Sequence, residues 1–172
     1  MSLSDNRKPL RTAAVIVASD KGFAKEREDT SGEALVAILK RAGYVVYEKV
    51  ILPDEKNLLS DKMIEYVDDR NINLIVTTGG TGLSIRDCTP EATLAVIDRN
   101  VPGIAEAIRA YSLTITKRAM LSRGICGIRK QTLIINLPGS KKAVEESMEY
   151  ILDEVEHGLD LLLEGSGECA RI

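Results

Sequence analysis

Two short apolar segments constrain the fold of this chain more than any other feature. Ala13–Ala18 (AAVIVA) and Leu74–Thr78 (LIVTT) are continuous runs without alternating charged residues. Such runs are typical of parallel strands that are buried on both faces of a sheet. Amphipathic patterns separate the predicted strands, with apolar residues recurring at the helical spacing i, i+3, i+4, i+7. This alternation predicts an α/β fold, a three-layer sandwich around a mostly parallel sheet.

The same patterns place the remaining elements. Helices are expected over residues 31–42, 54–70, 104–113 and 144–159, with one more starting at Thr89-Pro90. Further strands are expected over residues 44–52, 124–128 and 132–136. The last two form an antiparallel edge hairpin that turns at Arg129-Lys130. The length predicts a single domain, 1–172, with loose ends at about 1–11 and 165–172.

Composition and charge argue against several classes of protein. Lys and Arg number 23 against 26 Asp and Glu, a net charge of −3, whereas general nucleic-acid binding needs a basic face. No apolar run approaches the roughly 18 residues of a membrane span, and Met1–Pro9 is too polar for a secretory signal. We therefore expect a cytoplasmic protein that binds neither nucleic acid nor membrane.

The cysteine and histidine residues argue against several further kinds of site. Cys88, Cys126 and Cys169 form no close pair, which argues against a disulfide framework and a structural zinc site. His157 is the only histidine and lies within the last helical pattern. Catalytic triads that need a histidine base are therefore nearly excluded.

Small, acidic and amide residues follow four of the predicted strands. They are Ser19-Asp20, Pro53-Asp54, Gly79-Gly80-Thr81-Gly82 with Arg86-Asp87, and Asn136-Leu137-Pro138-Gly139-Ser140. In open α/β sheets, ligands bind in the crevice outside the carboxyl ends of the strands. The four segments therefore predict one shared cleft.

Gly79–Gly82 is the most informative of these segments. Glycines permit a tight turn, and successive N–H groups can form a nest that binds an anion. The segment is neither a Walker A loop nor a GxGxxG motif, because no Gly-Lys-Ser/Thr follows and Ile85 stands where the third glycine would be. A simple strand-to-loop turn is the alternative. Arg86, Asp87 and the helix start at Thr89-Pro90 favour a phosphate with a metal ion.

Asp54 and Asp87 each allow two interpretations. Taken alone, Asp54 is explained as the cap of the helix that follows it, and Asp87 as part of a local turn. Taken together, the two carboxylates could hold Mg²⁺ on a triphosphate, since that ion usually takes one or two carboxylates. The pair therefore favours phosphoryl or nucleotidyl transfer. Arg123 is interpreted as a surface residue, with added charge for the cleft as its alternative role.

An ordered set of motifs covers nearly the whole chain, from about Ala13 to Leu163. It comprises Thr77-Thr78-Gly79-Gly80-Thr81-Gly82, Arg86-Asp87, Thr89-Pro90-Glu91-Ala92, Ser19-Asp20, Pro53-Asp54-Glu55, Leu121-Ser122-Arg123, Gly127-Ile128-Arg129 and Asn136-Leu137-Pro138-Gly139. This set resembles the MogA/MoaB family of molybdenum-cofactor biosynthesis proteins, whose domain type also occurs in gephyrin.

The resemblance implies a MogA-like fold and a molybdopterin adenylyltransferase. In this family ATP and molybdopterin give adenylylated molybdopterin and pyrophosphate, with Mg²⁺ required. The proteins are typically homotrimers, and the downstream molybdate-inserting enzyme is an implied partner. Asp54 and Asp87 match the family's two essential aspartates, which would bind the Mg²⁺. Ser122 matches a serine of the substrate site, and Gly79–Gly82 and Asn136–Gly139 match the loops that line it.

One departure and one alternative accompany the resemblance. Many close relatives have Asn-Pro after Pro-Gly, whereas Ser140-Lys141 stand there in this chain.

The alternative function is a non-catalytic pterin-binding or scaffolding module, and the presence of both Asp54 and Asp87 favours the enzyme over it. The nucleophile would be the terminal phosphate of molybdopterin, which carries about −1.5 to −2 charge at pH 7 and needs no histidine base.

Overall fold

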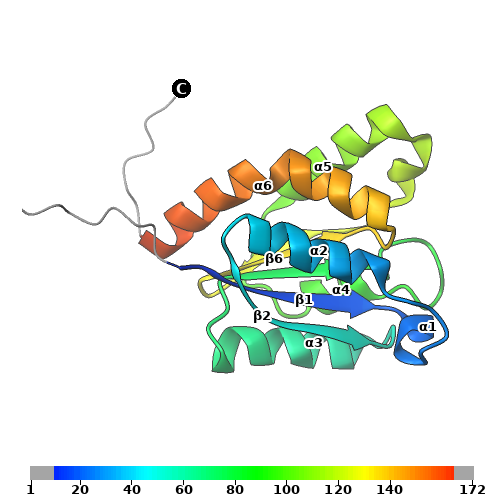
Figure 1. Ribbon diagram of the computed structural model, residues 1–172, viewed down its shortest axis with the longest axis horizontal. Helices are drawn as coiled ribbons and strands as arrows, with labels where there is room; N and C mark the ends of the chain where they lie inside the picture. The colour runs from blue at the N-terminus through cyan, green and yellow to red at the C-terminus, as the bar shows by residue number, and fades with distance from the viewer. Residues whose placement is uncertain (1–9, 165–172) are drawn as a thin grey trace, which may run out of the picture.

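The computed structural model describes residues 10–164, which form one sheet between two layers of helices (Figure 1). One face of the sheet is covered by α2 (Thr30–Arg41), α5 (Pro102–Ile115) and α6 (Lys141–Glu164). The other face is covered by α3 (Lys56–Ile64) and α4 (Thr89–Leu94). The predicted three-layer α/β sandwich is confirmed. Within residues 10–164, no helix has the length and apolar character needed to cross a membrane.

Six strands form the sheet in the order β2-β1-β3-β6-β5-β4. They are β1 (Thr12–Ala18), β2 (Val45–Leu52), β3 (Leu74–Thr78), β4 (Arg99–Asn100), β5 (Cys126–Arg129) and β6 (Thr132–Leu137). The pairs β2–β1, β1–β3 and β3–β6 are parallel, whereas β5 is antiparallel to both β6 and β4. The sheet is therefore mostly parallel across its centre, as predicted.

The predicted hairpin is present, but two details differ. Its turn lies at Lys130-Gln131, one residue later than expected, and Lys130 has a positive φ of 50°. The hairpin also does not form the edge of the sheet, because β4 pairs with β5 on its outer side. Both residues of β4 are exposed, and two exposed residues are too few to carry a hydrophobic pattern.

Alternate residues of β1 enter two separate cores. Val15 and Val17 pack with α2, α5 and α6, whereas Ile16 and Ala18 pack with α3 and α4. Every residue of the run Ala13–Ala18 is at most 4% exposed. Burial on both faces therefore explains why this segment has no polar alternation.

The predicted helix over 54–70 begins and ends differently. Its N-cap position is Glu55, the α-helix starts at Lys56, and its last part is a π-helical segment, η1 (Glu65–Asp69). Asp54 therefore does not cap this helix, and the interpretation of Asp54 as a helix cap is wrong. The carboxylate of Asp54 is instead engaged with the loop that follows β1.

The predicted helix start at Thr89-Pro90 is confirmed, and three further details of the helices differ from expectation. Thr89 does not cap α4, because Cys88 holds the N-cap position and the Thr89 hydroxyl donates to the Gly79 carbonyl at 2.9 Å. The polar stretch after β1 contains a short helix, α1 (Asp20–Phe23), capped by the Ser19 side chain. The helix expected over 104–113 extends to both sides, as α5.

The predicted loose ends lie mostly outside the described residues, in 1–9 and 165–172. Arg11, the last residue of the expected N-terminal loose end, belongs to the fold instead. Its side chain is buried and forms an ion pair with Asp160 of α6. Its carbonyl accepts a hydrogen bond from the Val45 amide at 2.9 Å, which extends the β1–β2 pairing.

Candidate active site

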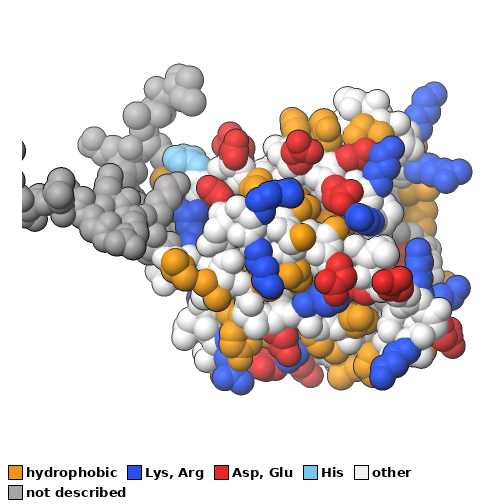
Figure 2. All heavy atoms as spheres, viewed as in Figure 1, with side chains coloured by type: hydrophobic (Ala, Val, Ile, Leu, Met, Phe, Trp, Pro, Cys, Tyr) orange, Lys and Arg blue, Asp and Glu red, His pale blue; other side chains and the backbone are white. Residues whose placement is uncertain are grey.

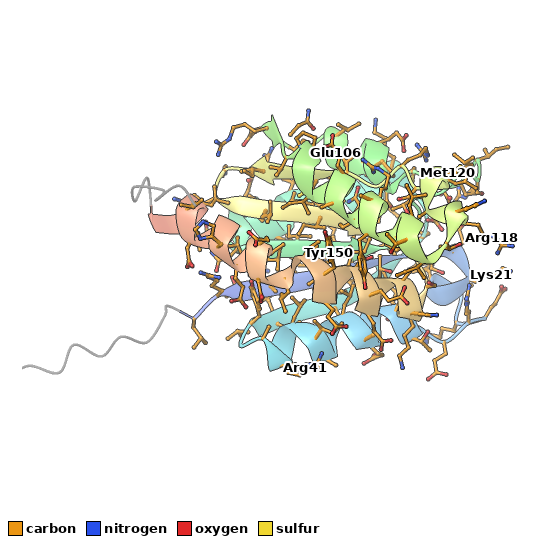
Figure 3. The ribbon with its side chains drawn as sticks, turned by 90° about the horizontal axis from the view of Figure 1, so that it is seen from above. Lys21, Arg41, Glu106, Arg118, Met120 and Tyr150 are labelled. Carbon is orange, nitrogen blue, oxygen red and sulfur yellow. The ribbon has the colours of Figure 1, made fainter. Side chains whose placement is uncertain are left out.

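The carboxyl ends of β2, β1, β3 and β6 meet at one edge of the sheet, because these four strands are parallel neighbours. From β1 the chain adds β2 on one side and β3 on the other, so the topological switch point lies between β1 and β3, where such sheets bind ligands. The predicted site segments follow these strands. Figure 3 shows Lys21, next to Asp20, and Arg118 at this end of the molecule.

A cleft with two lobes opens at this edge, and the lobes share Gly79, Gly80, Asp87 and Gly139. The polar lobe has a volume of about 220 Å³ and is also lined by Ser19, Arg27, Asp29, Ser31 and Asp54. The apolar lobe has a volume of about 380 Å³ and is also lined by Ile108, Arg109, Arg118, Leu121 and Ser122. The predicted shared cleft is thus present, and two chemically different spaces meet at the glycine loop.

The loop geometry requires glycine at positions 79 and 80. Gly79 and Gly80 have positive φ angles of 92° and 63°. A Cβ atom on Gly79 would lie 2.3 Å from the Ala18 carbonyl oxygen, and one on Gly80 would lie 2.4 Å from Thr89 Oγ1 and 2.8 Å from Asp54 Oδ1. The end of β3 therefore packs directly against the end of β1 and the start of α4.

The amide groups of this loop fit the predicted anion nest. The Gly79 amide donates to the Leu137 carbonyl at 3.2 Å. Within residues 10–164, the amides of Gly80, Thr81 and Gly82 have no protein acceptor. Backbone N–H groups without a protein partner beside a cleft are the groups that bind phosphate oxygens.

Asp20 and Arg86 hold the loops of β1, β2 and β3 together. Arg86 donates to both oxygens of Asp20, at 3.0 and 2.9 Å, and lies 3.3 Å from Glu55. These hydrogen bonds hold the pKa of Asp20 below its ordinary value and raise the pKa of Arg86. Asp20 and Arg86 therefore form an ion pair in this structure, and Arg86 orients the Asp20 carboxylate.

Asp54 presents a carboxylate oxygen towards the glycine loop without a protein partner. Its Oδ2 accepts from the Asp20 amide at 3.0 Å. Its Oδ1 is buried and has no hydrogen-bond partner within residues 10–164. Burial is the main cause that raises the pKa of Asp54, and the nearby carboxylates of Asp20 and Asp87 raise it further. A buried, unpartnered oxygen among like charges is a position that a cation would stabilise.

The donor set fits Mg²⁺ bound together with a phosphate. No group of three or more His, Cys, Asp or Glu side chains in the described part of the chain could hold a metal ion by itself. Mg²⁺ is usually bound by one or two carboxylates, with substrate phosphates and water completing its octahedron. Asp54 and Asp87, which both line the polar lobe, are the residues that would hold it.

Asp87 lies in a local turn and also lines the cleft. It lines both lobes, and it also closes a local turn, in which its amide donates to the Ser84 carbonyl at 3.0 Å. The Asp87 carbonyl accepts from Arg123 at 2.7 Å. The turn and the contact with Arg123 fix the position of the carboxylate.

Arg123 supports the glycine loop, a role that was not predicted from the sequence. Its guanidinium donates to the carbonyls of Gly82 and Asp87, both at 2.7 Å, and pairs with Glu91. Its amide donates to the Thr81 carbonyl at 2.8 Å. Arg123 is thus half-buried and fastens the glycine loop to the start of α4. The motif Leu121-Ser122-Arg123 was the sequence signal that could have indicated this supporting role.

The remaining predicted residues divide into two groups. Ser122, Pro138 and Gly139 line the apolar lobe. Asn136 is 3% exposed and lies beneath the cleft, where its amide donates to Thr77 at 3.0 Å and Thr93 at 2.9 Å. Ser140 accepts from the Ala143 amide at 3.2 Å, in the first turn of α6. Asn136 and Ser140 therefore both form hydrogen bonds within the protein, which hold the sheet edge and the start of α6.

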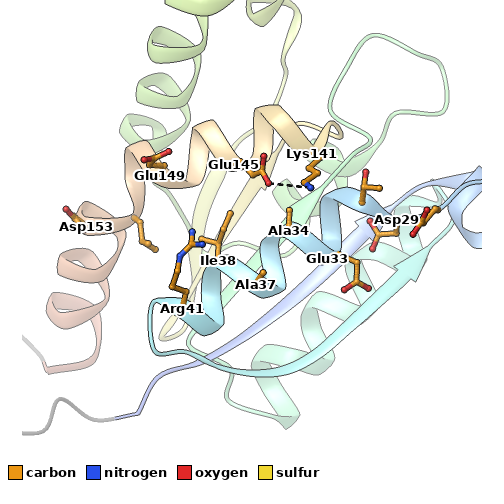
Figure 4. Close-up of a pocket in the computed structure, with 13 residues that line it drawn as sticks. Asp29, Glu33, Ala34, Ala37, Ile38, Arg41, Lys141, Glu145, Glu149 and Asp153 are labelled. Atoms are coloured by element: carbon orange, nitrogen blue, oxygen red, sulfur yellow. Dashed lines mark ion pairs between the residues drawn. The ribbon is translucent and has the colours of Figure 1, made fainter.

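A larger hollow, of about 800 Å³, lies between α2 and α6 (Figure 4) and shares Glu28, Asp29 and Thr30 with the rim of the polar lobe. Carboxylates from both helices line it, among them Glu33, Glu145 and Glu149, and Lys141 pairs with Glu145 at 3.9 Å. Acidic and basic side chains are interspersed over this face (Figure 2). None of its described lining residues is a glycine or ends a strand, so it lacks the features that suit the cleft to phosphate chemistry.

Comparison with known proteins identifies the family. Residues 14–157 match the family model described as a probable molybdopterin binding domain. The chain is 38% identical over 151 residues to molybdopterin adenylyltransferase of Helicobacter pylori strain J99, covering 87% of this chain and 86% of that protein. It is 40% identical over 142 residues to molybdopterin adenylyltransferase of Haemophilus influenzae, covering 81% and 72%.

A solved structure agrees with the sequence comparison. The crystal structure of the molybdopterin biosynthesis enzyme MoaB from Thermus thermophilus superposes with a TM-score of 0.84 at 41% identity, over 92% of this chain and 100% of that one. Sequence and structure thus agree on the family. The chain belongs to the molybdopterin-binding domain family.

Proposed function

We propose that this protein transfers AMP from ATP to the terminal phosphate of molybdopterin and releases pyrophosphate. The observation that carries the proposal is Asp54 Oδ1, a buried oxygen without a protein partner in the described structure that faces the glycine loop. The relatives named molybdopterin adenylyltransferase support it. The proposal includes a cytoplasmic location, where ATP is available.

The two lobes suit the two substrates. The apolar lobe, lined by Ile108 and Leu121, matches a flat pterin with few charges on its faces. The polar lobe, with Asp54 and Arg27 on its lining, matches a nucleotide triphosphate with its metal ion. The phosphates to be joined would then meet at Gly79 and Gly80, which both lobes share.

The reaction needs positioning and charge neutralisation rather than a base. An oxygen of the molybdopterin phosphate attacks the α-phosphorus of ATP, the bond from that phosphorus to the bridging oxygen breaks, and pyrophosphate leaves with the electron pair. Mg²⁺, when bound, would supply positive charge to the triphosphate, and Asp54 and Asp87 would hold it. The amides of Gly80 to Gly82 bind phosphate oxygens in the attacking geometry.

The test is a direct assay with a matched variant. Purified protein is incubated with molybdopterin, ATP and Mg²⁺, and both adenylylated pterin and pyrophosphate are quantified. Wild type is expected to form both products, and only when Mg²⁺ is present. Asp87→Asn is expected to form neither product but to retain pterin binding. Full activity of Asp87→Asn would remove that residue from the mechanism.

A non-catalytic pterin-binding module is the other outcome of this assay. Tight pterin binding by wild type without any product would establish it. The carboxylate pair favours the enzyme, because a protein that only binds pterin does not need a metal-binding pair beside its anion nest.

We propose a homotrimer as the assembly, with the molybdate-inserting enzyme as the downstream partner. Exposed apolar side chains next to the apolar lobe support a subunit contact, among them Leu113 and Ile115 of α5 and Met120 and Leu121 of the 3-10 helix η2 (Lys117–Leu121). Light scattering on the purified protein tests the trimer, and a monomer at micromolar concentration would contradict it.

A further inference from the structure

We propose that Arg27 binds the β- and γ-phosphates of ATP and, after transfer, the departing pyrophosphate. This assignment rests on the proposed adenylyl transfer and names the residue that recognises the phosphate tail. Arg27 lies between α1 and α2, is exposed, and lines the polar lobe. Arg27 is not part of any motif that carries the family resemblance.

The charge balance of the polar lobe requires such a residue. Among its described lining residues, the carboxylates are Glu28, Asp29, Asp54 and Asp87, and Arg27 is the only cation. ATP brings several further negative charges, and one Mg²⁺ offsets only two of them. A second positive group on the phosphate tail is therefore needed to stabilise the charge that develops on the leaving pyrophosphate.

Three other cations near the polar lobe, none of which lines it, are already engaged. Arg86 binds Asp20 and Glu55, Arg123 binds Glu91 and two loop carbonyls, and Lys49 binds Asp29 and Glu33. Arg27 has no hydrogen bond or ion pair within residues 10–164. Its guanidinium is thus free to bind two phosphate oxygens in the bidentate geometry that arginine favours.

The backbone that carries Arg27 is held on both sides. Before it, the Glu26 amide donates to the Lys21 carbonyl at 2.9 Å. After it, Asp29 accepts from the Gly32 amide at 2.7 Å and from Lys49 at 2.9 Å. The α1 end of this segment is in turn bonded to Asp54 through Asp20. Arg27 and the metal-binding carboxylate are therefore presented by one connected unit, which limits the entropy lost on binding.

The test compares Arg27→Gln, Arg27→Lys and Arg41→Gln with wild type. Arg41 is an exposed arginine at the end of α2 that is farther from Arg27, and it does not line the polar lobe, so Arg41→Gln is a matched control for charge. Calorimetry measures the affinity for Mg-ATP, Mg-pyrophosphate and AMP, and steady-state kinetics separates KM for ATP from kcat. The unfolding midpoint of each variant shows that it is folded.

Arg27→Gln is expected to weaken Mg-ATP and Mg-pyrophosphate binding by about ten- to thirtyfold, as for the loss of charge-assisted hydrogen bonds. AMP affinity should not change, because AMP lacks the β- and γ-phosphates. Arg27→Lys should show a smaller loss, and Arg41→Gln none. Unchanged ATP and pyrophosphate affinities in Arg27→Gln, or an equal loss in Arg41→Gln, would overturn the assignment.

The same experiment separates this inference from the proposed function. A wild type that binds Mg-ATP through Arg27 but forms no adenylylated pterin would overturn the transferase and leave Arg27 as a phosphate ligand. If the wild type forms product and Arg27→Gln keeps the wild-type KM for ATP, the transferase stands and the assignment of Arg27 is overturned.

Discussion

Asp20 and Asp54 exchange hydrogen bonds between the segments that follow β1 and β2. The Asp20 amide donates to Asp54 Oδ2 and the Asp54 amide donates to Asp20 Oδ1, both at 3.0 Å. The two carboxylates nevertheless differ in charge environment, because Arg86 compensates Asp20 whereas Asp54 Oδ1 has no partner in the described structure. The pKa of Asp20 is lowered and that of Asp54 is raised. One aspartate thus ties the loops together, and the other is left for a cation.

Asp54→Asn should stabilise the metal-free protein while removing activity. A raised folded-state pKa means that the stabilising contribution of Asp54 is present below its ordinary value of 3.8 and is lost as the pH rises through the raised pKa. At pH 7 the ionised side chain is therefore unfavourable, and a neutral Asn can still accept from the Asp20 amide. We expect a gain of about 0.5–1 kcal/mol, after allowance for solvent screening.

Thermal unfolding in EDTA measures this gain. Asp61→Asn, an exposed position in α3, is the control and should leave the midpoint unchanged. A lower midpoint for Asp54→Asn would show that the Asp54 carboxylate is satisfied without metal.

With ATP present, Mg²⁺ should stabilise the wild type in a pH-dependent way. At ten times its Kd, the ion raises the free energy of unfolding by about 1.4 kcal/mol. Protons compete with the metal at Asp54, so the stabilisation should decrease as the pH falls, and at a higher pH than for an ordinary aspartate, because the pKa of Asp54 is raised. Melting curves with and without Mg²⁺ across the acidic range check this. An equal shift in Asp54→Asn would place the ion elsewhere.

Gly80→Ala should distort the cleft and destabilise the fold. The new Cβ would lie 2.4 Å from Thr89 Oγ1 and 2.8 Å from Asp54 Oδ1, in a backbone with φ of 63°. We expect a loss of about 1–3 kcal/mol, with a fall in adenylyl transfer as Asp54 is displaced. Gly103→Ala is the matched control, since no atom lies within 4 Å of its added Cβ. Denaturant unfolding and the product assay compare the two, and equal effects would refute the steric argument.

Arg123→Gln should impair the glycine loop more than Arg123→Lys. Gln loses the fork that reaches the carbonyls of Gly82 and Asp87 as well as the charge opposite Glu91. We expect kcat/KM to fall by about ten- to a hundredfold and stability by about 1–3 kcal/mol. Arg123→Lys keeps the positive charge and should retain part of the activity and part of the stability. Wild-type activity in Arg123→Gln would make this a surface contact without consequence.

Asn136→Leu separates a structural role from a substrate-binding one. The change removes donors to Thr77 and Thr93 and the acceptor of the Ile125 amide, all in a buried position. Destabilisation of about 2–4 kcal/mol is expected. The Kd for molybdopterin, measured at a temperature where the variant is folded, should match that of wild type. A weakened Kd without destabilisation would return Asn136 to the substrate site.

The sequence by itself was sufficient to predict the layered architecture and a cleft at the carboxyl ends of the strands. Continuous apolar runs such as Ala13–Ala18 can only be accommodated by strands covered on both faces, so they predict the central parallel sheet. Because the carboxyl ends of parallel neighbours meet, the sequence alone assigns Asp54, Gly79 and Asp87 to one cleft. These inferences depend on local patterns and on the direction of strands, both of which are encoded in short segments.

Only the tertiary structure decided which polar residues face the cleft and which are used for support. Asn136 and Arg123 lie in similar motif segments, yet Asn136 is buried under the sheet edge and Arg123 fastens the glycine loop. Asp54 could equally have capped a helix until its contact with the Asp20 amide was seen. The partners Thr77 and Thr93 of Asn136, Gly82 and Glu91 of Arg123, and Asp20 of Asp54 lie 32 to 59 residues away in sequence. Hydrogen bonds over such separations depend on how the loops pack together, and no local pattern specifies that packing.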